Sequence, residues 1–220
     1  MFNIKKLGAY ARSLPKSMYF NLKYFPFSKA IRLPILISHR VWLMKTAGNI
    51  ILPECKTERI KIGFGEVGIF DKHRSRSIWQ VSGTVEFKGK AKIGHGSKIS
   101  VSGKLIIGSG FCMTAESSIV AQKEISFGNN VLVSWDALIM DTDFHDIFDE
   151  KGQLLNAPMP ISIGDNVWIG CRTLILKGIH IADGVVVAAA STITKTIDES
   201  NAIIAGSPAT VVKEKISWKP

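Results

Sequence analysis

Acidic residues are missing from the first 50 positions of the chain, although the full 220 residues contain 18 of them. Nine basic residues occur in the same segment, together with aromatic residues from Tyr10 to Trp42. Residues 1–80 contain 15 basic and 4 acidic residues, so the excess positive charge of the chain lies in its N-terminal part. This combination favours contact with an anionic membrane surface or an acidic polymer. The alternative is a solvated basic arm that packs loosely on the body.

Long apolar runs are also absent. The most apolar stretch, Ile31 to Met44, is interrupted by Arg32, Pro34, His39 and Arg40 and is too short to span a bilayer. The N-terminal lysines are not followed by the apolar segment of a secretory signal. We therefore expect a cytoplasmic protein that can contact the inner membrane face through its basic segment.

Cysteine is rare, and no nucleic-acid motif accompanies the charge. Cys55, Cys112 and Cys171 lie far apart without the spacing of a metal site, which is typical of a reducing compartment. Zinc-finger spacing, a helix-turn-helix pattern and the aromatic signature of RNA-binding domains are all missing. We therefore expect no nucleic-acid partner.

An aliphatic residue recurs every six positions in the second half of the chain. The series runs through Ile163, Ile169, Ile175, Ile181, Val187 and Ile193. Upstream, the same rhythm is carried by Val81, Phe87, Ile93, Ile99 and Leu105, then by Ile107, Met113 and Ile119, and then by Phe127, Val133 and Ile139. Between these groups the six-residue repeat slips by two residues. Such slips predict enlarged corners rather than a change of fold.

A period of six matches neither the 3.6 residues of a helical turn nor the alternation of a flat sheet. It predicts a triangular coil in which each side is one hexapeptide. Such coils stack, so that each one buries the apolar interior of the next. An irregular sandwich of short strands is the alternative, but it would require turn signals at a spacing of about 8–12 residues.

The rhythm is interrupted between Ile139 and Ile163, where 24 positions separate two repeats that one hexapeptide would place six apart. The surplus predicts an external loop over residues 140–162, and a long excursion from a rigid repeat is usually functional. His145 is the only histidine in the loop, and an imidazole is well suited to accept a proton from a hydroxyl. Asp143 or Asp146 could orient its ring. A loop histidine beside aspartates can also be an ordinary surface residue.

The chain from about Ile125 to Val212 resembles the hexapeptide-repeat O-acetyltransferases, through the segments DTDFHDIFDE, ISIGDNVWIG, ILKGIHIADG, AAASTITKTI and AIIAGSPATVVK. This family acetylates sugars and polysaccharides. The resemblance implies a mainly β, left-handed parallel β-helix, acetyl-CoA as the donor, a sugar or polysaccharide acceptor, a homotrimer and no metal. It also implies that His145 is the general base, and of the two neighbouring aspartates we place Asp143 in the catalytic site with it.

The same resemblance implies which residues contact the donor. They are Trp168, Cys171, Ala189, Thr194, Lys195, Thr210 and Lys213. Trp168 would shape the donor pocket, although it can equally be an aromatic residue at a coil corner, and the lysines would meet the CoA phosphates. The chain departs from the family at Thr210, where a basic residue is common, and at Ala188, where glycine is frequent.

These patterns divide the chain into three parts. We expect a basic, aromatic helical appendage over residues 1–50, broken at its three prolines. The β-helix should occupy residues 51–205, and a turn followed by a short capping helix should occupy residues 206–220.

Two other functions use the same coil. A non-catalytic scaffold would bind an anionic surface through the basic arm and would not need the histidine loop. A zinc enzyme similar to the γ-type carbonic anhydrases would need three histidines, two of them five residues apart. The histidines here are His39, His73, His95, His145 and His180, and none is five residues from another.

Overall fold

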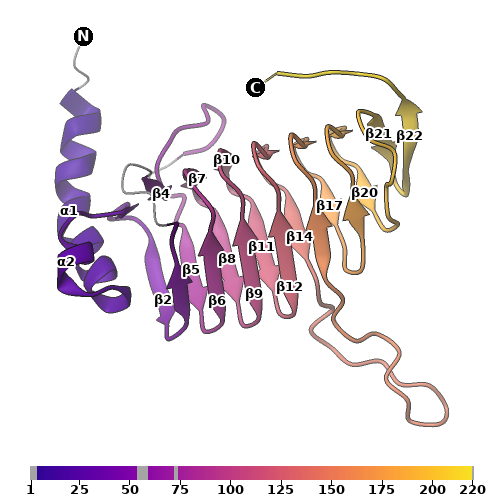
Figure 1. Ribbon diagram of the computed structural model, residues 1–220, viewed down its shortest axis with the longest axis horizontal. Helices are drawn as coiled ribbons and strands as arrows, with labels where there is room; N and C mark the ends of the chain where they lie inside the picture. Colours follow the sequence, from indigo (N-terminus) through magenta and orange to yellow (C-terminus); the bar gives the residue numbers. More distant parts are fainter. Residues whose placement is uncertain (1–3, 54–58, 72–73, 220) are drawn as a thin grey trace.

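The computed structural model describes residues 4–53, 59–71 and 74–219, so Cys55 and His73 lie outside the described residues. Three sheets of short strands form the sides of a triangular coil around one apolar interior (Figure 1). The predicted mainly β fold, a left-handed parallel β-helix, is confirmed.

Each of the first six turns of the coil contributes one strand to each sheet. The first sheet contains β1 (Ile35–Ile37), β4 (Ile60–Ile62), β7 (Ala91–His95), β10 (Phe111–Ala115), β13 (Leu132–Val133), β16 (Trp168–Ile169), β19 (Val186–Val187), β21 (Ile203–Gly206) and β22 (Ala209–Lys213). The second contains β2 (Trp42–Thr46), β5 (Ile78–Val81), β8 (Lys98–Val101), β11 (Ser118–Ala121), β14 (Leu138–Met140), β17 (Leu174–Ile175) and β20 (Thr192–Ile193). The third contains β3 (Asn49–Ile51), β6 (Thr84–Phe87), β9 (Lys104–Ile107), β12 (Glu124–Phe127), β15 (Ile161–Ile163) and β18 (His180–Ile181).

The predicted six-residue rhythm coincides with the core. Every residue of the rhythm is exposed by 3% or less. Equivalent positions of successive coils are paired in register, as Ile93 is with Met113 and Ile99 is with Ile119. Because each inward side chain lies on its counterpart in the next coil, the apolar interior is continuous along the stack.

The two-residue slips all fall at the corner between the second sheet and the third, which we call the loop corner. Ile99 and Ile107 occupy equivalent places on either side of it and are eight residues apart, as are Ile119 and Phe127. At each of the other two corners, successive coils turn through a residue with a left-handed backbone. These residues are Gly96, Glu116, Asp136, Arg172 and Ala190 at one corner, and Gly110, Asn130, Asn166, Gly184 and Asn201 at the other.

The N-terminal end of the coil is covered by α1 (Ile4–Tyr24) and α2 (Phe27–Ala30) (Figure 1). Asn21 of α1 is buried and bonds both backbone groups of Ile35, accepting from its N–H at 3.2 Å and donating to its carbonyl at 2.7 Å. Ser17 accepts from the N–H of Ile37 at 2.9 Å. These side chains occupy the hydrogen-bonding groups that a further strand would use on the edge of β1.

Apolar packing completes this cover. Phe20 is fully buried, and its ring meets the ring of Trp79 edge-on, with 5.4 Å between the centroids. The helix is therefore a part of the body and not a loosely packed arm.

Three expectations about the ends of the chain differ from the structure. The first coil already begins at β1, so the helical part ends near residue 30 and not at residue 50. The six-residue spacing is irregular in this coil, because the pairing of β2 with β5 shifts register between Leu43 and Lys45. The α1 helix also continues through Pro15, where a break was expected.

The predicted C-terminal helix is wrong. Residues 209–213 form β22, which pairs antiparallel with β21 and thus turns the chain back along the first sheet. The β-branched residues Thr210, Val211 and Val212 favour a strand, and the free edge of β21 supplies the hydrogen-bonding partner.

Candidate active site

The long loop leaves the coil at the loop corner, between β14 and β15. Asp141, its first residue, is fully buried. Its carboxylate accepts hydrogen bonds from the backbone N–H groups of Gln122 at 2.7 Å and Lys123 at 2.8 Å. Those two residues belong to the enlarged corner of the preceding coil. The start of the loop is therefore fixed to the coil by two charge-assisted hydrogen bonds.

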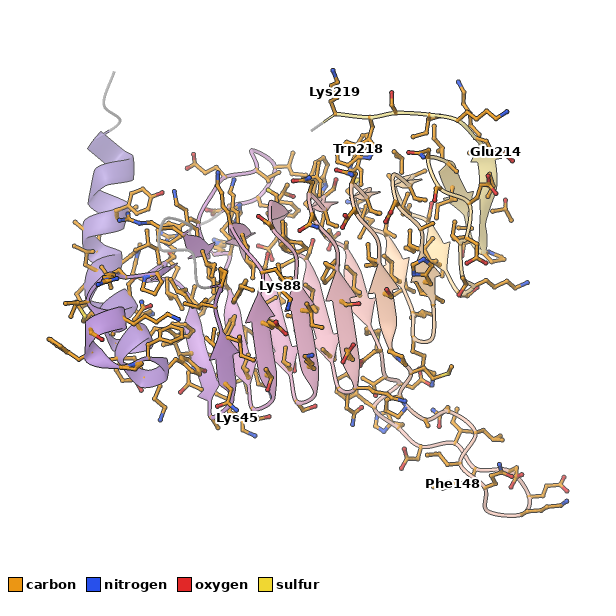
Figure 2. All side chains as sticks on the ribbon, viewed as in Figure 1. Lys45, Lys88, Phe148, Glu214, Trp218 and Lys219 are labelled. Carbon is orange, nitrogen blue, oxygen red and sulfur yellow. The ribbon has the colours of Figure 1, made fainter. Side chains whose placement is uncertain are left out.

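The loop returns to the coil beside its starting point. The N–H of Met159 donates to the carbonyl of Asp141 at 3.1 Å, and the N–H of Gly178 donates to the carbonyl of Met159 at 3.2 Å. Between these ends, the loop folds back on itself through an antiparallel bridge between Phe148 and Leu154. The folded loop projects away from the β-helix (Figure 1), and Phe148 lies on its projecting part (Figure 2).

His145 lies in a tight turn near the base of this loop. Its N–H donates to the carbonyl of Asp143 at 2.8 Å, and its own carbonyl accepts from the side-chain amide of Asn156 at 2.8 Å. The side chain is exposed, and within the described residues the imidazole has no hydrogen-bonding partner. The backbone of His145 is thus held in place while its side chain remains exposed.

Asp143 makes different contacts from those expected. Its carboxylate is bound by the ammonium group of Lys177 and, at 2.9 Å, by the side-chain amide of Asn156. Lys177 also donates to the carbonyl of Asn156 at 2.6 Å. The hydrogen bonds from Lys177 and then Asn156 hold the pKa of Asp143 below its ordinary value. In this chain, Asp143 therefore fixes the loop to the next coil instead of contacting the ring of His145.

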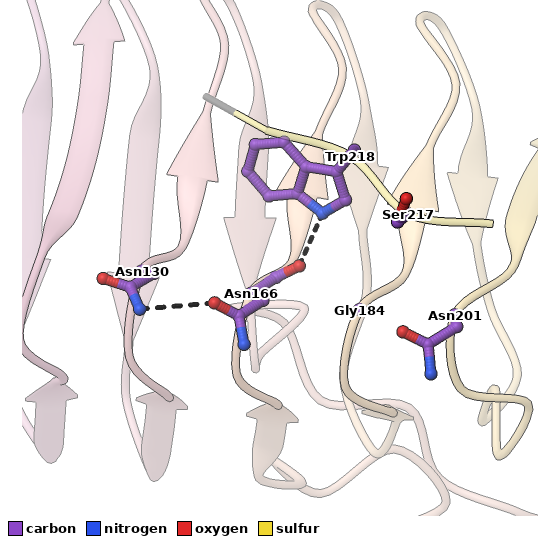
Figure 3. Close-up of a pocket in the computed structure, with 6 residues that line it drawn as sticks. All are labelled: Asn130, Asn166, Gly184, Asn201, Ser217 and Trp218. Atoms are coloured by element: carbon purple, nitrogen blue, oxygen red, sulfur yellow. Dashed lines mark hydrogen bonds between the residues drawn. The ribbon is translucent and has the colours of Figure 1, made fainter.

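Trp168 lies on the outer side of β16, where 38% of it is exposed. Its indole N–H donates to the hydroxyl of Ser134 at 3.0 Å, which fixes the orientation of the ring. The ring of Trp218, from the C-terminal tail, lies nearby, with 5.8 Å between the centroids. Trp218 in turn donates to the carbonyl of Asn166 at 2.6 Å (Figure 3).

A cavity of about 130 Å³ lies between this tail and the corner that joins the third sheet to the first. It is lined by Asn130, Asn166, Gly184, Asn201, Ser217 and Trp218 (Figure 3). The tail therefore adds a wall to the region next to Trp168.

The other predicted donor residues lie at three places on the last coils. Cys171 and Ala189 lie at the corner between the first and second sheets. There the carbonyl of Cys171 accepts a hydrogen bond from the N–H of Ala190. Thr194 and Lys195 are exposed at the loop corner. Thr210 and Lys213 are exposed on β22. Among the hydrogen bonds and ion pairs of the described residues, none joins these three pairs.

Four residues of this region have no signal in the sequence pattern. Lys177 and Asn156 bind the carboxylate of Asp143. Ser134 accepts the hydrogen bond of the Trp168 indole, and the ring of Trp218 lies beside the Trp168 ring. Lys177 lies 34 residues from Asp143 and Ser134 lies 34 residues from Trp168, so only the coil brings them together. Among the residues described, no three His, Cys, Asp or Glu side chains are grouped closely enough to hold a metal ion.

Residues 160–195 match the family model described as bacterial transferase hexapeptide (six repeats). The chain is 36% identical over 121 residues to the polysialic acid O-acetyltransferase of Neisseria meningitidis, a match that covers 54% of each chain. It is 32% identical over 110 residues to the galactoside O-acetyltransferase of Escherichia coli (strain K12), which covers 49% of this chain and 53% of the relative. The match thus spans about half the length of each of these relatives.

The fold also matches a solved structure over most of the chain. The crystal structure of the polySia specific acetyltransferase NeuO superimposes with a TM-score of 0.63 at 21% identity, over 84% of this chain and 79% of that one. At this level of identity the match concerns the fold alone. The matched repeats and the two relatives confirm the resemblance of this chain to the hexapeptide-repeat O-acetyltransferases.

Proposed function

We propose that the protein transfers an acetyl group from acetyl-CoA to a hydroxyl group of a sugar, in a surface polysaccharide or its lipid-linked precursor. The proposal rests on the position of His145. Its backbone is fixed at the base of an anchored loop, while its imidazole is exposed and has no hydrogen-bonding partner within the described residues. The relatives named above are O-acetyltransferases of polysialic acid and galactosides, which supports the same reaction class.

In the proposed reaction, the imidazole of His145 accepts the proton of the sugar hydroxyl as its oxygen attacks the thioester carbonyl of acetyl-CoA. The carbon–sulfur bond then breaks, and the proton on the imidazolium passes to the departing thiolate. The products are an acetyl ester and free CoA. Lys195 and Lys213 would bind the phosphates of the donor, and Trp168 would contact it near the reacting group.

We also propose that the protein acts as a homotrimer in the cytoplasm, where acetyl-CoA is available. The outward positions of the second sheet are apolar at Val120, Leu138, Met140 and Leu174, and all four are only half-buried in the single chain. The projecting loop adds four large apolar side chains that are more than half exposed, namely Phe144, Ile147, Phe148 and Leu155. Contacts with neighbouring chains would cover both surfaces.

The direct test is to incubate the purified protein with acetyl-CoA and a panel of neutral and acidic polysaccharides, and to measure thiol release together with ester formation by NMR. We expect acceptor-dependent thiol release matched by a new acetyl ester. Thiol release that no acceptor accelerates, or no CoA binding at all, would favour the non-catalytic scaffold instead.

The trimer is tested separately by analytical ultracentrifugation. Leu138→Asp is expected to shift the mass from three chains to one, whereas Ser126→Asp, on the polar third sheet, is expected to leave it unchanged. A monomeric wild-type protein would contradict this part of the proposal.

A further inference from the structure

The surface that covers the N-terminal end of the coil carries large apolar side chains that the described part of the chain leaves exposed. On α1, Tyr19 is 57% and Leu22 is 45% exposed, and beyond α1 Phe27 is 71% and Ile31 is 49% exposed. Several large apolar groups exposed on two neighbouring helices of a folded protein usually mark an interaction surface.

The helix geometry separates this surface from the buried side of α1. Ser13, Ser17, Phe20 and Asn21 face the coil and are buried. At 3.6 residues per turn, the opposite side of the helix presents Pro15, Tyr19 and Leu22, which are all exposed. The apolar residues therefore point away from the body, along the axis of the stack.

Positive charge surrounds the apolar groups. Arg12, Lys23, Lys29 and Arg32 are all exposed on the same elements or next to them. Within the part of the chain that the structure describes, none of these four residues forms an ion pair with an acidic side chain. No aspartate or glutamate occurs in residues 1–50 that could neutralise them locally.

We propose that this end face, defined as Arg12, Tyr19, Leu22, Lys23, Phe27, Lys29, Ile31 and Arg32, docks on an anionic lipid bilayer. Aromatic and aliphatic side chains that enter the headgroup region, ringed by lysine and arginine, are the combination by which peripheral segments bind acidic membranes. A protein partner is less well matched, because the cores of such interfaces are depleted of lysine.

The proposal includes an orientation. Since the end face is perpendicular to the stack, the axis of the coil would stand upright on the membrane, with α1 and α2 in contact with lipid (Figure 1). None of the described helices is both long and apolar enough to cross a membrane. In a trimer with parallel coils, three end faces would point to the same side and bind together, which increases the overall affinity.

The test is sedimentation with vesicles of phosphatidylcholine, with or without about a third of phosphatidylserine. We expect the wild-type protein to bind only the acidic vesicles and to lose binding as salt reduces the Debye length to ~3 Å. The triple variant Lys23→Glu, Lys29→Glu, Arg32→Glu should reduce binding at least tenfold. The matched control is Lys90→Glu, Lys92→Glu, Lys123→Glu, which makes the same charge change on the sides of the coil and should bind nearly as the wild type does.

A second pair of variants separates the apolar part from general electrostatics. Tyr19→Ser with Phe27→Ser keeps the charge and should still weaken binding to acidic vesicles severalfold, with thermal unfolding unchanged. Equal losses in both triple variants would overturn the end face as the binding site, because diffuse charge would then explain the binding. Binding to a soluble acidic polysaccharide, without any binding to vesicles, would assign the surface to a polymer. His145→Ala should bind vesicles as the wild type does, so the outcome is independent of the proposed reaction.

Discussion

Asp143 and Lys177 form an ion pair that joins the projecting loop to the coil that follows it. The loop is also fixed at Asp141, which binds the coil that precedes it. His145 lies only two residues beyond Asp143, so its position depends on contacts with coils on both sides of the loop.

Breaking the ion pair should loosen the loop without removing the base. We expect Lys177→Met and Asp143→Asn each to lower kcat about tenfold, and the double variant to lower it little further, because both single changes remove the same contact. Steady-state kinetics of the four proteins form the double-mutant cycle. Lys151→Met, at the exposed turn of the loop, is the control. Fully additive losses would show that the two residues act separately.

The same pair predicts a pH dependence. Its hydrogen bonds lower the pKa of Asp143 below the ordinary value of 3.8. The carboxylate therefore contributes stability that is fully present above that ordinary value and is lost as the pH falls through the lowered pKa of the folded state. The difference in urea midpoint between the wild type and Asp143→Asn should be constant from pH 7 to about pH 5 and should shrink in stronger acid. A difference that grows in acid would contradict this assignment.

His145→Ala should lower kcat by the ~10²–10⁴ that is typical of a lost general base. The KM for acetyl-CoA should change much less, because the imidazole acts on the hydroxyl group. His180→Ala provides the control, since the exposed side chain of His180 lies on β18 of the third sheet and is not part of the loop. Unchanged turnover in His145→Ala would remove the central element of the proposed mechanism.

Lys195→Ala and Lys213→Ala should each raise the KM for acetyl-CoA more than they lower kcat. Contacts to a remote nucleotide stabilise the ground state and the transition state alike. Lys90→Ala, far from these residues along the stack, should leave both parameters unchanged. If the two variants mainly lost kcat, the donor would bind in a different pose.

Asn21→Leu should destabilise the fold through the edge of β1. The change leaves the buried N–H and carbonyl of Ile35 without their side-chain partner, which costs about 1–3 kcal/mol. Urea unfolding followed by circular dichroism measures the loss. Lys23→Leu, exposed on the same helix, should have little effect, and an equal loss there would indicate a change in helix propensity instead.

The coil could be predicted from the sequence because its stability depends on a local pattern. A residue such as Ile169 must be apolar, since it lies on Val133 before it and Val187 after it, and this requirement repeats every turn. The loop could be located for the same reason, because a surplus of residues between Ile139 and Ile163 has no place inside the repeat.

The contacts of the site could not be predicted in the same way. Whether Asp143 binds His145 or Lys177 depends on where the loop folds back, which is decided by contacts across the coil. The local pattern over residues 210–216 predicts a short helix, but pairing with the free edge of β21 outweighs it and forms a strand. The capping role of α1 depends on Ser17 and Asn21, whose partners are backbone groups that carry no sequence signal.

The loop corner is where the chain tolerates changes in length. In every coil from β7 onward, the other two corners turn through a residue with a left-handed backbone at an equivalent position. An inserted residue there would shift that position out of line with the coils on either side. The loop corner already holds two extra residues in some coils and the whole projecting loop in another, with the core pairing intact on both sides. Insertions and deletions at this corner can therefore reshape the surroundings of His145 while the scaffold remains the same.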